Sequence, residues 1–164
     1  MPTPNATSQA SLPLPFVLTH DQMLRYTQQY EGERFLDGRP RVPDSILERT
    51  KQVTCEQAWS VLKEHGYNCQ YQGKWVVTHD NPVLVGRAVT CNFIPHRPDV
   101  ADIVLEQAKE QGLEGRDKHW VMDRLVKDDV IAADLLDKQI GGGFIGDNLA
   151  NMIYEKTGTG CVVW

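Results

Sequence analysis

The second half of the chain alternates between two spacings of apolar residues, which predicts helices between strands. Apolar side chains recur at the 3.6-residue period of a helix over residues 99–112. Short apolar runs at 83–91, 130–134 and 160–164 are typical of strands. Strands that alternate with helices indicate an α/β domain with crossover connections. The strands of such a domain are normally parallel and covered on both faces.

Pairs of residues with capping-box spacing mark two helix starts in the first half of the chain. Thr19 and Gln22 form one pair, and Thr54 and Gln57 form the other. Asp44 can cap a short helix between these two. Each pattern predicts a helix that begins within a residue or two of the cap.

Two further features, one before the apolar run 83–91 and one inside it, concern strands. Residues 74–78, Lys-Trp-Val-Val-Thr, predict a strand that is followed by a turn at 79–82. Gly86 lies inside the apolar run 83–91, and a glycine in a strand usually marks a bulge or a close backbone approach. Further along, residues 119–126 predict a short helix.

The chain divides near Pro43 into an N-terminal extension, residues 1–43, and a main domain, residues 44–164. The extension begins with a segment rich in Pro, Ser and Thr that lacks the basic start of a secretory signal, and 32–43 has linker composition. The main domain reaches the end of the sequence inside an apolar strand. A strand of this kind is normally followed by more chain, so we expect the domain to be truncated or cleaved on its C-terminal side.

Composition and charge exclude several classes of protein. The 164 residues are 41% hydrophobic and carry a net charge of -5, without a basic run, which argues against nucleic acid but leaves a protein partner open. No segment approaches the roughly 20 apolar residues of a membrane span. The 4 cysteines show no metal-binding spacing, which predicts reduced thiols and a cytoplasmic location.

The main candidate for chemistry is the glycine run at 141–146, which opens a helix. A helix start offers unpaired N–H groups and partial positive charge, and glycines allow a ligand to approach the backbone. The run therefore suits a carboxylate or phosphate, although a loop that only needs positive φ angles remains an equal alternative. Gly141, Gly143 and Gly146 also match G-x-G-x-x-G, but residues 135–140 separate them from the strand and no acidic residue follows at the spacing of a dinucleotide site.

Acidic and histidine side chains add weaker candidates. Asp147 is interpreted first as a helix cap, and as a group that moves a proton or orients metal-bound water in second place. Asp134 ends a strand, where α/β sites gather, but a solvated aspartate is the simpler interpretation. The 5 histidines show no mutual metal-ligand spacing. His96 and Arg97 form at most a weak anion-contacting loop.

Two blocks of sequence, taken in order, resemble the RraA-like/4-hydroxy-4-methyl-2-oxoglutarate aldolase family. The first, residues 85–91, is similar to the family's V-G-x-A-x-T strand. The second combines the strand 130–134, which ends in aspartate, with Gly-Asp-Asn-Leu-Ala at 146–150 and the glycine-rich strand start at 158–163. The resemblance covers about residues 44–164.

This resemblance implies an α/β fold of the layered ββα, swivelling-domain-like type, incomplete here at the C-terminus. It implies assembly into homotrimers or homohexamers and a lyase that uses a divalent metal, Mg or Mn. Such a class II aldolase or decarboxylase cleaves 2-oxo acids, such as 4-hydroxy-4-methyl-2-oxoglutarate and oxaloacetate, and releases pyruvate. The alternative within the family is a regulator that binds a ribonuclease or another protein and catalyses nothing.

The resemblance also assigns roles to residues. The stretch Gly146, Asp147, Asn148 and Leu149 matches the family's substrate contacts, and Asp147 matches the aspartate that helps to position metal-bound water. The family's G-x-R-D motif, whose Arg grips the pyruvyl group and whose Asp holds the metal, is expected beyond Trp164. The sequence therefore predicts no metal ligand in this chain, poor metal binding and little turnover.

Overall fold

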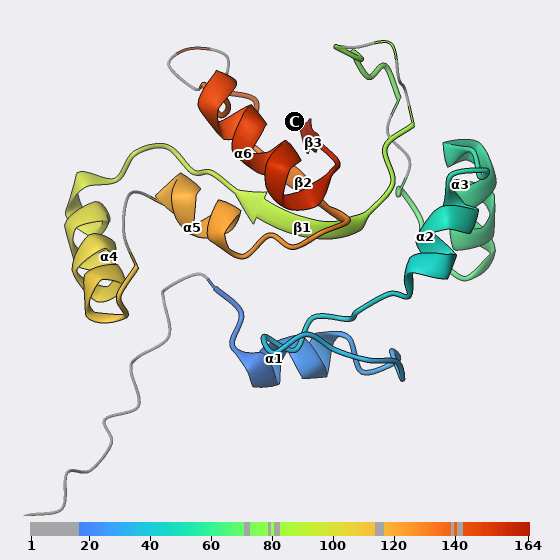
Figure 1. Cartoon of the computed structure of the whole chain (residues 1–164), viewed down its shortest axis with the longest axis horizontal. Coiled ribbons are helices and arrows are strands. Elements are labelled where there is room, and N and C mark those ends of the chain that lie inside the picture. Colours follow the sequence, from blue (N-terminus) through green and yellow to red (C-terminus); the bar gives the residue numbers. More distant parts are fainter. Residues whose placement is uncertain are drawn as a thin grey trace, which may run out of the picture.

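The computed structural model of the protein describes most of the chain after its first residues. The description covers residues 17–70, 73–78, 80, 83–113, 117–138, 140 and 143–164, with the side chain of residue 117 left aside. The elements, drawn in Figure 1, are α1 (His20–Tyr26), α2 (Asp44–Thr50), α3 (Cys55–Glu64), β1 (Arg87–Asn92), α4 (Pro98–Glu110), α5 (Asp117–Asp123), β2 (Asp129–Asp134), α6 (Asp147–Thr157) and β3 (Cys161–Val163).

The three strands form one parallel sheet in the order β1-β2-β3. Arg87 pairs with Asp129 at the start of the β1–β2 ladder, and Asn92 pairs with Asp134 at its end. Helices α4 and α5 connect β1 to β2, and α6 connects β2 to β3. The mixed α/β architecture with crossover connections is therefore confirmed, whereas the RraA-like layering stays a prediction. All strands begin at one edge of the sheet, the amino end, and finish at the other, the carboxyl end.

The main core lies on the face of the sheet to which Ile131 and Ala133 of β2 project. Side chains of α5 and α6 cover this face, and the buried members are Met122, Leu125, Ile131, Ala133, Phe144 and Ile153. On the other face, the β1 side chains of Ala88, Thr90 and Asn92 are exposed. The coverage of both faces expected for a parallel sheet is thus not seen at β1 among the described residues.

Side-chain capping marks where helices α1 and α3 begin. Both capping boxes are present, with the hydroxyls of Thr19 and Thr54 accepting hydrogen bonds from Gln22 and Gln57. The cap predicted at Asp44 is wrong by one residue, because Pro43 is the N-cap of α2 and Asp44 is its first helical residue. This position still suits an acidic side chain, since it lies at the positive end of the helix dipole.

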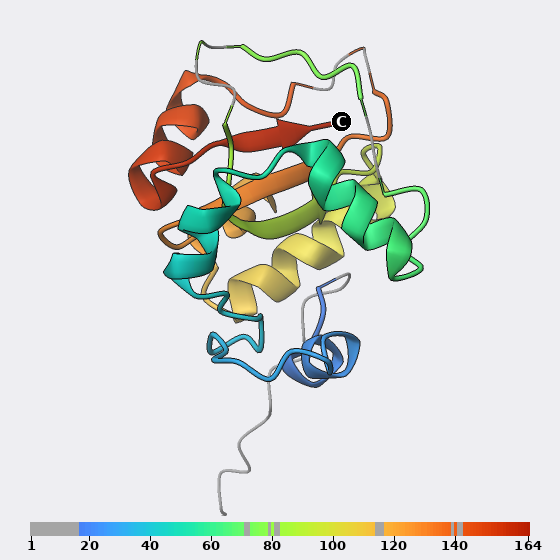
Figure 2. The same ribbon diagram turned by 90° about the vertical axis from the view of Figure 1, so that its right-hand side faces the viewer.

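The strand predicted for residues 74–78 is wrong. The segment 73–78 has no regular secondary structure, and Val76 is 88% exposed. Figure 2 shows the segment passing along the β3 side of the sheet, where the Trp75 ring meets that of Trp164 edge-on at 6.0 Å. High β-propensity alone does not make a strand, because strand structure also requires a backbone partner.

The close backbone approach predicted at Gly86 is confirmed. β1 begins at Arg87 rather than at Val83, and Gly86 lies just before it. A Cβ at Gly86 would lie 2.6 Å from the Asp128 carbonyl oxygen and 2.6 Å from the Val130 side chain. The absence of a side chain at this position therefore lets the chain enter the sheet beside β2.

Helix α3 has the apolar face that its sequence predicts, yet none of its residues is buried. Val61 and Leu62 are 56% and 40% exposed. Figure 1 shows α3 at the side of the molecule, away from α5 and α6. None of the helices in the described part of the chain has the length and apolar character needed to cross a membrane.

Candidate functional site

The carboxyl end of the sheet brings together two polar side chains that are 42 residues apart. The Asn92 side-chain amide donates to Asp134 Oδ2 at 3.0 Å, and Asp134 Oδ1 accepts from the Leu136 N–H at 2.7 Å. Both carboxylate oxygens of Asp134 are thus engaged. The aspartate joins the ends of β1 and β2 and holds the loop that follows, which is more than the solvated role predicted for it.

The loop after β2 contains a tight turn with unusual backbone angles. Leu136 and Asp137 have φ values of 55° and 52°, in the left-handed region that residues other than glycine rarely adopt. The Lys138 N–H donates to the Leu135 carbonyl across the turn at 3.3 Å. The Lys138 ammonium reaches the carbonyl of Phe93, just after β1. Contacts from both strands therefore hold a turn that costs roughly 1–3 kcal/mol per strained residue.

Helix α6 begins directly after Gly146, the last residue of the glycine run. Gly146 is the N-cap with extended backbone, and no side chain donates to or accepts from this cap. Asp147 is consequently not the cap, which corrects the first interpretation of this residue. Asp147 and Asn148 are exposed, whereas Leu149 packs against the main core and anchors the helix.

The four consecutive residues predicted as substrate contacts, Gly146 to Leu149, thus form the N-cap and the first turn of a helix of 11 residues. Their N–H groups lie where a helix cannot supply its own acceptors. A Cβ at Gly146 would meet nothing within 4 Å, so the space beside the cap is open. Gly143 lies nearby in sequence, and its carbonyl accepts from the Lys118 ammonium at 2.7 Å. Gly141 lies outside the described residues.

The residues that the structure describes contain no group of three His, Cys, Asp or Glu side chains that could hold a metal ion. Asp134 is engaged by Asn92 and by the backbone, and Asp147 is exposed on the first turn of α6. The donor set for the expected Mg²⁺ or Mn²⁺ is therefore not found within these ranges.

In the loop at His96 and Arg97, which was suggested to contact an anion, the arginine already binds a carboxylate of this chain. The Arg97 guanidinium donates to both carboxylate oxygens of Asp99, the second residue of α4. This hydrogen bonding lowers the pKa of Asp99 and raises that of Arg97. Since Arg97 is already paired with a carboxylate, it is a poor candidate for a further anion.

A polar hollow of about 210 Å³ lies at the opposite, amino end of the sheet, away from the start of α6. It is lined by α2 and by the residues that precede the three strands, namely Asp44, Leu47, Glu48, Lys51, Val83, Leu84, Val85, Asp128, Gly158 and Thr159. The sequence interpretation missed this hollow. The one related signal in the sequence is Arg87, a charged first residue of β1, which pairs with Asp44 in the lining of the hollow.

The four cysteines are free, as predicted. Cys55 and Cys69 are exposed, and Cys91 and Cys161 are partly buried beside the main core. Burial, followed by the proximity of Cys161, raises the pKa of Cys91 to about 11. Burial also raises the pKa of Cys161, so neither of these thiols is an activated nucleophile.

Comparison with known proteins adds no relative to this picture. No family model, no curated protein and no solved structure matches the chain.

Proposed function

We propose that this chain carries the carboxylate-binding part of a lyase that acts on 2-oxo acids, of the divalent-metal-dependent aldolase or decarboxylase type that its sequence resembles. The substrates would be 4-hydroxy-4-methyl-2-oxoglutarate or oxaloacetate, and the product pyruvate. One observation carries the proposal: α6 begins, without a side-chain cap, at Gly146, after a loop that leaves the carboxyl end of β2. Ligands of parallel α/β sheets bind at this end of the strands.

The first turn of α6 can hold a small carboxylate by its backbone. N–H groups at Asp147, Asn148 and Leu149 have no acceptor within the helix, and the partial positive charge of the helix start favours an anion. Gly146 leaves room for close approach because it has no side chain. Leu149 packs on the core and keeps this turn in place.

The described residues limit what the chain does by itself. Since they contain no donor set for a metal, the chain's own role in the proposal is to bind and orient the substrate carboxylate. The Asp147 carboxylate lies on the same turn and is exposed. We assign it the positioning of a water molecule or a proton beside the bound acid.

The backbone role is tested by the pair Asn148→Pro and Asn148→Ala. Proline is tolerated in the first turn of a helix but lacks the N–H group, whereas alanine keeps it. Losing one hydrogen bond to a charged group costs about 1.5–3 kcal/mol, so pyruvate or oxalate should bind Asn148→Pro on the order of tenfold or more weakly. Asn148→Ala should bind these acids nearly as well as the wild type. Amide chemical shifts, followed during titration, measure both affinities.

Equal affinity in the two variants would remove the first turn of α6 from the proposed site. Absence of shifts at residues 146–149 in the wild type, at saturating acid, would do the same. A separate assay concerns turnover: we expect little or no oxaloacetate decarboxylation by the 164-residue chain with Mg²⁺ or Mn²⁺. Robust turnover would refute the division of the site, and its insensitivity to Asp147→Ala would refute the role of that carboxylate.

The alternative function, a regulator that binds another protein, is favoured by exposed apolar surface. Val61 and Leu62 on α3 and Trp75, Val76 and Val77 on the neighbouring segment are 40–88% exposed. Several exposed apolar side chains of this kind are compatible with an interaction site, which includes a site between copies of one chain. Sedimentation of the protein at several concentrations distinguishes a monomer from the expected trimer or hexamer.

A further inference from the structure

Residues 33–44, which we call the strap, connect α1 to α2 and lie at the amino end of the sheet. Within the strap, the Arg41 N–H donates to the Glu33 carbonyl at 2.8 Å and the Phe35 N–H to the Arg39 carbonyl at 2.9 Å. The Arg34 guanidinium makes four further hydrogen bonds, one to the Gly38 carbonyl and three to the end of α1 and the turn after it. These contacts make the strap a braced hairpin rather than the linker that its composition suggests.

The first attachment of the strap to the sheet is an ion pair between Arg39 and Asp129. Arg39 Nη1 lies 3.3 Å from Asp129 Oδ2, and the two side chains are 14% and 0% exposed. Asp129 Oδ2 also accepts from the Val126 N–H at 3.0 Å, whereas the buried Oδ1 has no hydrogen-bond partner. A fully buried carboxylate with so few donors depends on its single arginine.

The second attachment is Arg87, the first residue of β1, whose side chain is 6% exposed. Its guanidinium donates to the Val42 carbonyl of the strap at 2.9 Å and to the Lys127 carbonyl at 3.2 Å, and it pairs with Asp44. Asp44 is also the first residue of α2, which forms one wall of the amino-end hollow. The strap and this wall are therefore held by the same arginine.

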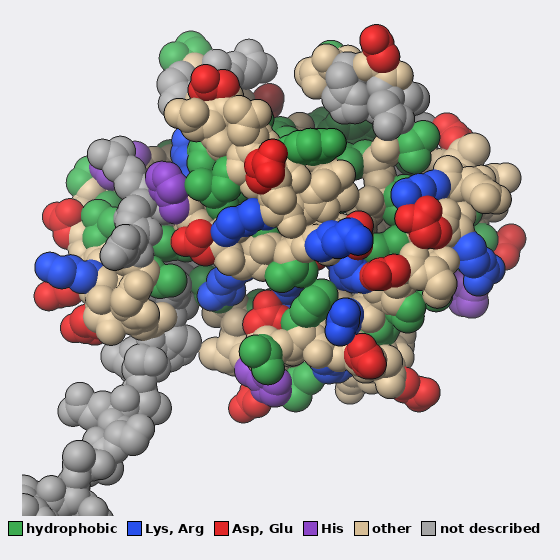
Figure 3. Space-filling model, viewed as in Figure 1, with side chains coloured by type: hydrophobic (Ala, Val, Ile, Leu, Met, Phe, Trp, Pro, Cys, Tyr) green, Lys and Arg blue, Asp and Glu red, His purple; other side chains and the backbone are tan. Residues whose placement is uncertain are grey.

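Apolar burial contributes little to these attachments, and Figure 3 shows charged side chains of both signs across the middle of the face that is also viewed in Figure 1. Leu36, at the tip of the hairpin, is 103% exposed, no apolar side chain of residues 33–44 is buried, and Leu47 is the one buried residue of α2. The Phe35 ring lies under the guanidinium groups of Arg39 and Arg87, whose central carbons are 4.9 and 5.9 Å from the ring centroid. A segment held by a few charged contacts opens at a lower free energy than a core packed by apolar side chains.

We propose that the strap and α2 form a conformational latch that opens as one unit while the sheet stays folded. In the closed state, Arg39 pairs with Asp129 and with Asp37, and Arg87 holds both Val42 and Asp44. Opening removes α2 from the hollow and exposes the polar residues that precede the strands. Because breaking a buried ion pair leaves a charge without its partner, Arg39 and Asp129 control this opening.

Site-resolved tryptic cleavage, followed by mass spectrometry, tests the latch in the full chain. The Arg41–Val42 bond reports on the strap, the Arg49–Thr50 bond on α2, and the Lys156–Thr157 bond, next to the buried Thr157 of α6, on global unfolding. The main variant combines Arg39→Ala with Asp129→Asn, which removes the pair without leaving a buried charge. Because this variant loses the charged hydrogen bonds of Arg39, we expect the first two bonds to be cut at least about tenfold faster than in the wild type, and the third at the same rate.

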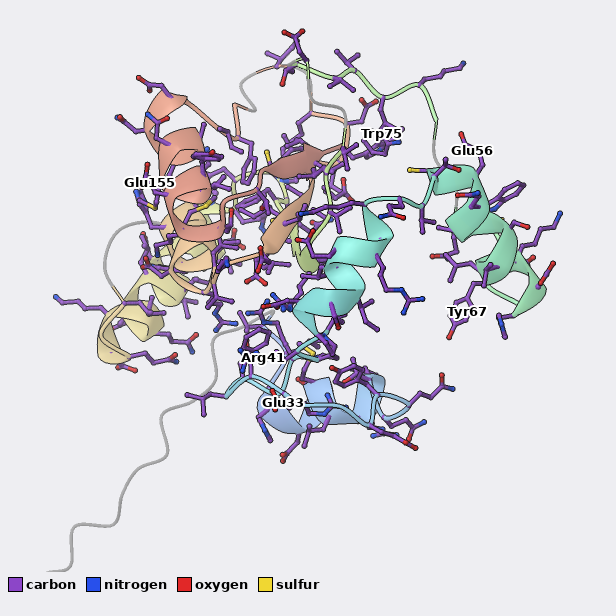
Figure 4. All side chains as sticks on the ribbon, turned by 45° about the vertical axis from the view of Figure 1, so that its right-hand side comes forward. Glu33, Arg41, Glu56, Tyr67, Trp75 and Glu155 are labelled. Atoms are coloured by element: carbon purple, nitrogen blue, oxygen red, sulfur yellow. The ribbon has the colours of Figure 1, made fainter. Side chains whose placement is uncertain are left out.

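The matched control is Glu33→Gln, which removes a different ion pair of the same strap. Glu33 and Arg41 lie 3.5 Å apart and are 81% and 54% exposed, on the loop after α1 that Figure 4 labels. Exposed ion pairs contribute little to stability, so the cleavage rates of Glu33→Gln should stay within about twofold of those of the wild type. Cleavage of the strap bond or of the α2 bond in the double variant at the wild-type rate would refute the latch. Equal acceleration of all three bonds would refute it too, because the whole protein would then be unfolding. The same cleavage rates in Glu33→Gln as in the double variant would also contradict it.

Discussion

Replacement of Gly86 by alanine tests how tightly the chain enters the sheet. The new Cβ would lie 2.6 Å from the Asp128 carbonyl oxygen and 2.6 Å from a Val130 methyl group, closer than any ordinary contact of a Cβ. The same Asp128 oxygen accepts the Arg87 N–H at 2.8 Å, so a shift that relieves the clash also lengthens this hydrogen bond. Forcing an extra methyl group into such a site costs about 1–3 kcal/mol, and a weakened backbone hydrogen bond adds to it.

We therefore expect Gly86→Ala to lower the free energy of unfolding by about 2–3 kcal/mol. Urea denaturation, followed by tryptophan fluorescence and by circular dichroism, measures this change. The midpoint should fall while the slope with urea stays unchanged, since the surface exposed on unfolding is nearly the same. Coincident transitions from the two probes support the two-state treatment on which the value depends.

The control is Gly143→Ala, because a Cβ at Gly143 would meet nothing within 4 Å. This exchange should leave stability within about 0.5 kcal/mol of the wild type or raise it slightly, because alanine restricts the unfolded chain more than glycine does. A Gly86→Ala variant as stable as Gly143→Ala would refute the close approach before β1.

Three further predictions concern the thiols and α3. At pH 8, a thiol reagent should label the exposed Cys55 and Cys69 quickly and the partly buried Cys91 and Cys161 slowly, and equal rates for all four would contradict their burial. Because the pKa of Cys91 in the folded protein is raised from 9.0 to about 11, its contribution to stability is present below pH 9 and is lost as pH rises toward 11, which denaturation at each pH measures. Thr54→Ala removes the cap of α3, worth about 1 kcal/mol, and should reduce helical circular dichroism without moving the main unfolding transition, because no residue of α3 is buried. Ser60→Ala, on the same helix, is its control, and a lowered main transition in Thr54→Ala would show that α3 is coupled to the core.

Much of the local structure follows from the sequence because short-range chemistry decides it. The two capping boxes, at Thr19 and Thr54, and the left-handed glycine that ends α6, at Gly158, involve only neighbouring residues. The alternation of strands and helices after residue 83 likewise predicts the parallel sheet that is observed. At the candidate site, the sequence placed Gly146 to Leu149 at a helix start, and the structure shows them in the first turn of α6.

Contacts between residues far apart in the chain leave no comparable pattern in the sequence. The strap is attached by Arg39 to Asp129, 90 residues away, and by Arg87, 45 residues from Val42. Asp134 similarly meets Asn92 across the sheet. A charged side chain in sequence looks the same whether it is solvated or buried against a partner, so composition alone suggested a linker and a solvated aspartate.

The segment 73–78 shows that local sequence can also predict an element that the tertiary structure does not form. Its residues favour a strand, but strand structure requires a partner chain at hydrogen-bonding distance, and among the described residues the sheet contains only β1, β2 and β3. The sequence by itself determined where helices α1 and α3 begin, the alternation of strands and helices, and the position of the helix start at which we propose that an anion binds. Only the tertiary structure decided which charges are buried, where the hollow lies and which predicted strand finds a partner, because burial and pairing depend on residues far apart along the chain.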